Sequence, residues 1–234
     1  AIRFSNQAQF HPMKFILQIV KGLNIYEHTP AREYTGKAVT TDHGRITAKK
    51  IIVATHFPLF NKHGAYFLKL YQKRSYVLAL ENAQQVMGMY LDDDNGGFSF
   101  RNHGELLLLG GGSHRTGKES NGWDALEAFA KQHYPQASVQ YRWATQDCMS
   151  LDGMPYIGRY SKRTEGLYTA TGFNKWGMTG SMVAARLLTD LLTGRENPCE
   201  ALLSPSRSIL HPQLAVNGLE AMGHLLIPTK KRCP

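Results

Sequence analysis

The sequence has few cysteines and no long apolar run. Only three cysteines occur in 234 residues, Cys148, Cys199 and Cys233, and none forms a CxxC pair. This pattern supports neither a disulfide framework nor a zinc knuckle. Ten histidines are present without an HExxH arrangement, so we predict no metal site. No stretch of about 18 apolar residues occurs, which predicts no membrane span.

No basic and apolar leader opens the chain, so we expect a reducing, cytoplasmic location. The chain carries 27 Lys and Arg against 18 Asp and Glu, a formal net charge of +9. Such a surplus attracts nucleic acid and acidic surfaces in general. The basic residues are scattered, however, and no basic stripe with interleaved aromatics occurs. This favours a solvated basic surface, with nucleic-acid binding as the weaker alternative.

The spacing of apolar residues predicts a mixed fold of helices and strands in one or two domains. Helices are expected over residues 12–22, 123–134 and 181–192. Strands are expected over residues 25–28, 38–41, 45–48, 51–54, 76–80, 86–90, 98–101, 106–109, 139–143 and 167–171. The short turns between residues 76 and 109 predict an antiparallel sheet. Beyond Pro198 the proline-punctuated chain predicts a loose arm.

The strand, turn and helix over residues 167–192 are the strongest single feature. The turn contains Gly172, Gly177 and Gly180, which let the backbone approach a ligand closely. The start of the helix presents unpaired N–H groups and a partial positive charge. This arrangement suits a phosphate, a carboxylate or a flavin ring. The alternative, of about equal weight, is a connection whose glycines serve packing alone.

The stretch Ala170–Thr179, followed by a helix of small residues, resembles the C-terminal flavin motif of the D-amino-acid-oxidase-like FAD oxidoreductases. Three further stretches, over residues 9–27, 51–56 and 147–158, are similar to that family in the same order. The resemblance implies a parent that binds FAD and oxidises a C–N bond of an amine or amino acid by hydride transfer. The alternative is a non-catalytic basic domain that binds nucleic acid or a protein partner.

The chain also departs from the family pattern. It has no GxGxxG after a strand near its start, so the first βαβ unit that holds the FAD pyrophosphate is missing. We therefore expect an N-terminally truncated chain that binds FAD poorly and is inactive alone. Residues 143–147 and 175–179 look most like the subgroup with a C-terminal Rieske domain. Cys233-Pro234 stands where its [2Fe-2S] motif would begin, or is an incidental terminus; this chain cannot hold the cluster.

The resemblance assigns candidate site residues. Eight residues would lie against the isoalloxazine ring: Gly172, Phe173, Asn174, Lys175, Trp176, Gly177, Met178 and Thr179. Ala54, Thr55 and His56 would line the FAD cleft, and Ala31 would touch the adenine. Lys175 is the candidate catalytic residue, because a lysine near flavin stabilises its reduced form; the alternative is a surface lysine.

Substrate contacts and a flavin link are more open. Tyr76 and Arg142 come from strands of the expected substrate sheet, where Arg142 could pair a substrate carboxylate or simply face solvent. Cys148 lies where sarcosine oxidases link a cysteine to flavin, although a buried structural cysteine is favoured. No side-chain base is expected.

The expected fold class is mixed α/β, with a partial Rossmann-like FAD domain and a largely antiparallel substrate domain. Residues 1–58 and 144–198 would form parts of the FAD domain. Residues 59–143 would form the substrate sheet, and residues 199–234 a C-terminal arm. The partner would be a small amine or amino acid.

Overall fold

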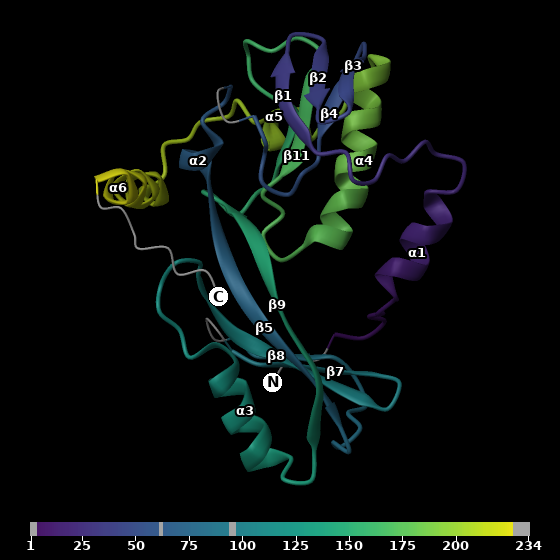
Figure 1. The fold of residues 1–234 in the computed structure, drawn as a ribbon, viewed down its shortest axis with the longest axis vertical. Helices are drawn as coiled ribbons and strands as arrows, with labels where there is room; N and C mark the ends of the chain where they lie inside the picture. Colours follow the sequence, from purple (N-terminus) through teal and green to yellow (C-terminus); the bar gives the residue numbers. More distant parts are fainter. Residues whose placement is uncertain (1–3, 61–62, 94–96, 227–234) are drawn as a thin grey trace.

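A computed structural model describes residues 4–60, 63–93 and 97–226 of the chain. Figure 1 shows a large sheet in the lower half, with helix α3 beside it, and smaller sheets in the upper half with helix α4. This arrangement confirms the predicted mixed fold with an antiparallel sheet. None of the helices in the described part of the chain has the length and apolar content needed to span a bilayer.

The large sheet has the strand order β6-β7-β8-β5-β9, and every neighbouring pair is antiparallel. Its strands are β5 (Leu70–Glu81), β6 (Tyr90–Leu91), β7 (Ser99–His103), β8 (Leu106–Arg115) and β9 (Ser138–Ser150). The strand predicted over residues 86–90 is wrong except at its end. The Val86 amide donates to the side-chain oxygen of Asn102 at 2.7 Å, so it is not available to a ladder.

Helix α3 (Gly122–His133) packs on one face of this sheet. Leu126 and Ala130 are buried against a core that includes Tyr76, Leu78 and Leu109, since apolar side chains recur on one helix face. The predicted amphipathic helix over residues 123–134 is confirmed. It covers one side of the sheet.

The upper half holds two three-stranded sheets. The first is the antiparallel sheet of β1 (Ala31–Thr35), β2 (Ala38–Thr41) and β3 (Gly44–Thr47), which confirms the strands predicted over residues 38–41 and 45–48. The second has the order β10-β11-β4, from β10 (Tyr156–Arg159), β11 (Leu167–Thr171) and β4 (Ile51–Val53). In it, β11 runs parallel to β4 and antiparallel to β10.

Strand β4, predicted over residues 51–54, has one side chain that stays open to solvent. Helix α4 (Gly177–Thr193) packs on β10 and β11. Because β4 lies at the edge of the sheet, Ile52 stays 44% exposed. Helix α1 (Pro12–Ile19) confirms the first predicted helix, one turn shorter.

The strand expected over residues 25–28 is wrong. No backbone hydrogen bond joins Ile25–His28 to a strand in the described structure, and a strand cannot form without such a partner. The expected loose arm contains α5 (Glu200–Leu203) and α6 (Pro212–Leu226), and α6 packs beside α2 (Tyr66–Lys69). Cys233-Pro234 lies outside the described residues.

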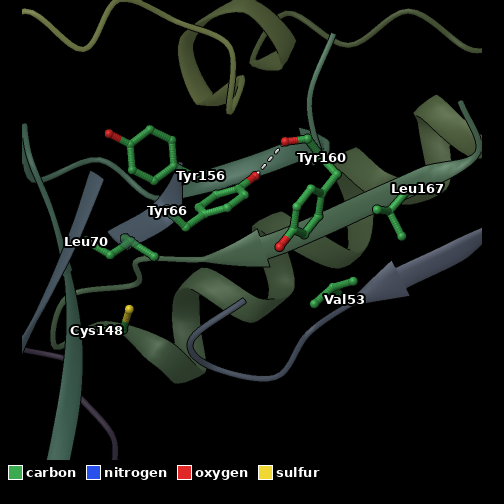
Figure 2. Close-up of a cluster of buried hydrophobic side chains, with 7 residues drawn as sticks. All are labelled: Val53, Tyr66, Leu70, Cys148, Tyr156, Tyr160 and Leu167. Atoms are coloured by element: carbon green, nitrogen blue, oxygen red, sulfur yellow. Dashed lines mark hydrogen bonds between the residues drawn. The ribbon is translucent and has the colours of Figure 1, made fainter. Parts of the chain in front are cut away.

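Strands β5 and β9 connect the halves. Leu70 and Cys148 belong to a buried cluster with Val53, Tyr66, Tyr156, Tyr160 and Leu167, in which the Tyr66 hydroxyl donates to the Tyr160 carbonyl at 2.8 Å (Figure 2). Further along the same strand, Tyr76 belongs to the core under α3. The expected domain boundaries stay predictions. One of them lies between residues 143 and 144, and β9 continues across that point.

Candidate functional site

The candidate site begins where two parallel strands end. The pairing of Thr169 with Val53 means that residues 54–56 and 172–174 leave the sheet at the same edge. The Thr169 hydroxyl donates to the Val53 carbonyl at 2.9 Å, and the Thr171 hydroxyl donates to the His56 carbonyl. Ligands of open α/β sheets bind beyond such carboxyl ends. The structure therefore brings the predicted residues Ala54, Thr55 and His56 together with the predicted turn.

The turn after β11 has a left-handed backbone at two positions. Gly172 has φ = 69° and Asn174 has φ = 55°. A Cβ on Gly172 would lie 3.0 Å from Leu70 Cδ2, so both the backbone angle and the packing require glycine there. Asn174 tolerates its angle because its amide side chain forms local hydrogen bonds. We refer to residues 172–179 as the 172–179 turn.

Helix α4 begins in this turn without a cap. The Trp176 side chain makes no capping hydrogen bond, and the first turn has no acidic residue. Gly177, Met178 and Thr179 are exposed residues, and their amides have no acceptor among the residues that the structure describes. A Cβ on Gly177 would meet nothing within 4 Å. Free amides at a helix start attract electron-rich groups, so these residues fit the edge of a flavin ring.

Lys175 connects the turn to the large sheet. Its exposed side chain donates from Nζ to Ser113 Oγ on β8 at 3.2 Å. Opposite the irregular pairing at Gly112 and Ser113 stands Ser75, whose hydroxyl oxygen is buried without a hydrogen-bond partner in the described structure. Polar atoms from both halves thus meet beside the start of α4.

Asp147 adds a carboxylate near this point. Burial raises the pKa of Asp147, while the charges of Lys175 and His56 act to lower it. Lys175 of the 172–179 turn and His56 after β4 therefore both lie within electrostatic reach of Asp147 on β9. Sequence reasoning missed Asp147 and Ser113, because only the folded chain brings them to Lys175.

Cys148 points into the protein core. Its side chain is 2% exposed, and its Sγ lies 3.7 Å from the Thr171 hydroxyl oxygen. Burial raises the pKa of the Cys148 thiol, which opposes formation of the reactive thiolate. The structure confirms that Cys148 is buried, while its lack of a covalent link to flavin stays a prediction.

Other predicted contacts lie away from the turn. The Tyr76 ring packs edge-on to Trp123 with ring centroids 4.9 Å apart, and Arg142 Nη1 lies 3.2 Å from Glu127 Oε1, so both face α3. Ala31 starts β1, in a different sheet from the turn. In the part of the chain that the structure describes, no hydrogen bond or ion pair joins these three residues to the 172–179 turn, and their roles stay predictions.

The opposite face of the large sheet carries different side chains. Successive residues of a strand point to opposite faces, so Trp143 and Tyr141 project away from the α3 side that Arg142 occupies. Both aromatic side chains are exposed. The alternation of side chains along β9 is the sequence signal that places Trp143 and Arg142 on opposite faces of the sheet. It assigns Trp143 to the uncovered face only once the face that α3 covers is known.

Comparison with known proteins agrees with this geometry. Residues 1–191 match the family described as DAO, FAD dependent oxidoreductase. The chain belongs to this DAO family. It is 39% identical over 231 residues to YhfW of Bacillus subtilis (strain 168), which its name places among Rieske 2Fe-2S iron-sulfur proteins. That match covers 92% of this chain and 45% of YhfW, so the chain spans about half the length of this relative.

Two solved structures share the DAO-family fold. Glycine oxidase from Geobacillus kaustophilus matches with a TM-score of 0.66 at 22% identity, over 79% of this chain and 53% of that one. L-proline dehydrogenase from P. horikoshii matches with a TM-score of 0.63 at 18% identity, over 80% and 55%. The predicted family, its FAD dependence and the fold class are thereby confirmed.

Proposed function

We propose that this chain supplies the flavin-facing turn and the substrate sheet of an oxidoreductase that oxidises a C–N bond of an amine or amino acid. The observation that carries the proposal is the uncapped start of α4, placed beside the ends of β4 and β11 and connected to the large sheet by Lys175 and Ser113. The names of glycine oxidase and L-proline dehydrogenase support the substrate class.

When bound, FAD supplies the acceptor for a hydride from the substrate. The residues of this chain would hold and polarise it. The amides of Gly177, Met178 and Thr179 would favour negative charge at the ring edge, and the ammonium of Lys175 would add to that effect. Asn174 keeps the turn in its left-handed shape.

The substrate would lie between the turn and the face of the large sheet that α3 does not cover. Trp143 and Tyr141 give that face an apolar surface for the carbon part of an amine or amino acid. The similarity to YhfW supports a [2Fe-2S] Rieske centre elsewhere in the full-length protein, which would accept electrons from the flavin.

The test is to purify the full-length protein and record its visible spectrum. We expect flavin absorption bands that correspond to about one flavin per chain. An amine or amino acid should bleach these bands in the absence of oxygen. Absence of flavin, together with a steeply salt-dependent affinity for DNA, would overturn the proposal in favour of a basic binding domain.

A further inference from the structure

Arg207 lies between α5 and α6 and has an unusually complete set of partners. Its side chain is only 12% exposed. Nε and Nη2 donate to the two carboxylate oxygens of Asp152 at 2.8 and 2.7 Å. Nη2 also donates to the Met154 carbonyl at 2.6 Å, and Nη1 to the Pro155 carbonyl at 3.0 Å. The guanidinium carbon lies 3.8 Å from the centre of the Tyr156 ring.

These contacts fix the loop that follows β9. The planar fork of arginine matches a carboxylate with two parallel hydrogen bonds, which sets both the distance and the orientation of the pair. Asp152 in turn accepts from the Met154 amide at 3.1 Å. The loop over residues 152–155 is therefore held at a side chain and at two backbone carbonyls by one residue more than 50 positions away.

Lys69 secures the segment that carries Arg207. Its Nζ donates to the Pro205 carbonyl at 2.7 Å, and the residue is 8% exposed. A buried ammonium keeps a carbonyl partner because an unpaired buried charge is costly. Residues 205–207 are thus attached to α2 on one side and to the 152–155 loop on the other.

The far side of the same loop touches the 172–179 turn. The carbonyl of Gly153 accepts a hydrogen bond from Asn174 Nδ2 at 2.9 Å. Asn174 Oδ1 accepts from the Ser150 amide at 3.1 Å, and the Asn174 amide donates to the Cys148 carbonyl at 3.0 Å. The orientation of Asn174 thus depends on where the loop places Gly153.

We propose that Arg207 is a positioning residue for the flavin site, acting through the 152–155 loop and Asn174 on the amides at the start of α4. This inference rests on the proposed function. Arg207 makes no hydrogen bond to the 172–179 turn itself among the described residues, so its effect would pass through Gly153. The C-terminal segment is in this way a working part of the cofactor site.

The experiment compares Arg207→Met and Arg207→Lys in the full-length protein. Arg195→Met is the matched control, since Arg195 forms an ion pair with Asp190 near the end of α4 and is 63% exposed. Three quantities are measured: hydrogen exchange at the amides of Ser150 and Asn174 in flavin-free protein, FAD affinity, and the visible circular dichroism of bound flavin.

Arg207→Met is expected to speed exchange at both amides and to alter the flavin dichroism. FAD affinity should fall roughly 10- to 100-fold, as when other groups that orient ligand-holding residues are removed. Arg207→Lys keeps the positive charge but not the planar guanidinium, so its amide exchange and FAD affinity should lie between those of the wild type and Arg207→Met. It serves as the test variant if Arg207→Met does not fold. Arg195→Met should match the wild type.

The inference would be overturned if both Arg207 variants had the amide exchange and the FAD affinity of the wild type. It would also be overturned if Arg207→Lys alone had wild-type values of both. A wild-type protein without flavin would instead overturn the proposed function. In that case faster exchange in the variants would still support the mechanical part of the inference.

Discussion

The side chain of Asn174 joins the 172–179 turn to the end of β9, donating to Gly153 and accepting from the Ser150 amide. Asn174→Ala should therefore destabilise the protein by about 1–3 kcal/mol, because the Ser150 amide loses its acceptor. Urea unfolding measures this. Asn174→Asp keeps an acceptor for Ser150 and should cost less. Equal losses in both variants would contradict the assignment.

Substitutions at two glycines of the turn should distinguish an effect on stability from an effect on FAD affinity. Gly172→Ala should cost about 1–3 kcal/mol, because its φ of 69° is strained for alanine and Leu70 is close. Gly177→Ala meets no atom within 4 Å and should leave stability unchanged or raised. Its methyl group would project into the space proposed for flavin, so FAD affinity should fall. Unchanged affinity in Gly177→Ala would count against that placement.

Lys175→Met should lower the reduction potential of bound flavin. In the proposed site the exposed ammonium would stabilise the negative charge of the reduced form, and an exposed charge pair of this kind corresponds to roughly 5–20 mV for a two-electron couple. The effect should shrink at high salt. Spectroelectrochemical titration measures it, with the exposed Lys131→Met on α3 as the control. The same shift in both variants would show a general charge effect instead.

Stability in acid should depend on Asp152. The hydrogen bonds from Arg207 hold the pKa of Asp152 below its usual value of 3.8. As pH falls, the unfolded state takes up the proton first, so the stabilisation is present above pH 3.8 and is lost as pH falls through the lower folded pKa. Asp152→Asn should flatten this part of the stability curve, measured by urea unfolding.

Asp42→Asn is the control for the acid experiment. Asp42 pairs with Arg32 at 2.6 Å, and this bond also lowers its pKa, but both side chains are well exposed. Solvent and salt screen such pairs, so its removal should change the acid limb little. A larger effect from Asp42→Asn than from Asp152→Asn would contradict the importance given to Arg207.

Cys148 should be inert in the folded protein. Its burial and raised pKa oppose thiolate formation, whereas Cys199 is partly exposed. Timed alkylation with peptide mass spectrometry should label Cys199 well before Cys148. Acid precipitation of the full-length protein should also release all flavin into solution. Flavin retained on a peptide containing Cys148 would contradict this.

Local signals in the sequence predicted much of the fold. The strands predicted over residues 38–41 and 45–48 correspond to β2 and β3, and the run Leu167–Thr171 before a glycine led to β11 and α4. Each of these depends on residues that are neighbours in the chain. The same locality placed the 172–179 turn correctly at the end of a strand.

Features that depend on distant partners could not be predicted. Arg207 and Asp152 are 55 positions apart, and nothing near either residue indicates the other. The strand expected at Ile25–His28 has suitable residues but no partner in the described structure. The sequence could not predict whether Arg142 or Trp143 lies on the side of α3, because the alternation along a strand does not tell which face a helix will cover.

The pairing of β5 with β9 bears on how a substrate would arrive. It runs from Leu70 opposite Ser150 to Glu81 opposite Ser138, with one irregularity between Ala79 and Leu80. Strand β8 pairs with β5 on its other side from Lys73 to Leu80, and the strands cross from one buried cluster to the other. We therefore expect the two halves of the molecule to keep their relative position and not to open about a hinge. We expect admission and release to be gated by the movement of connecting loops over a fixed frame.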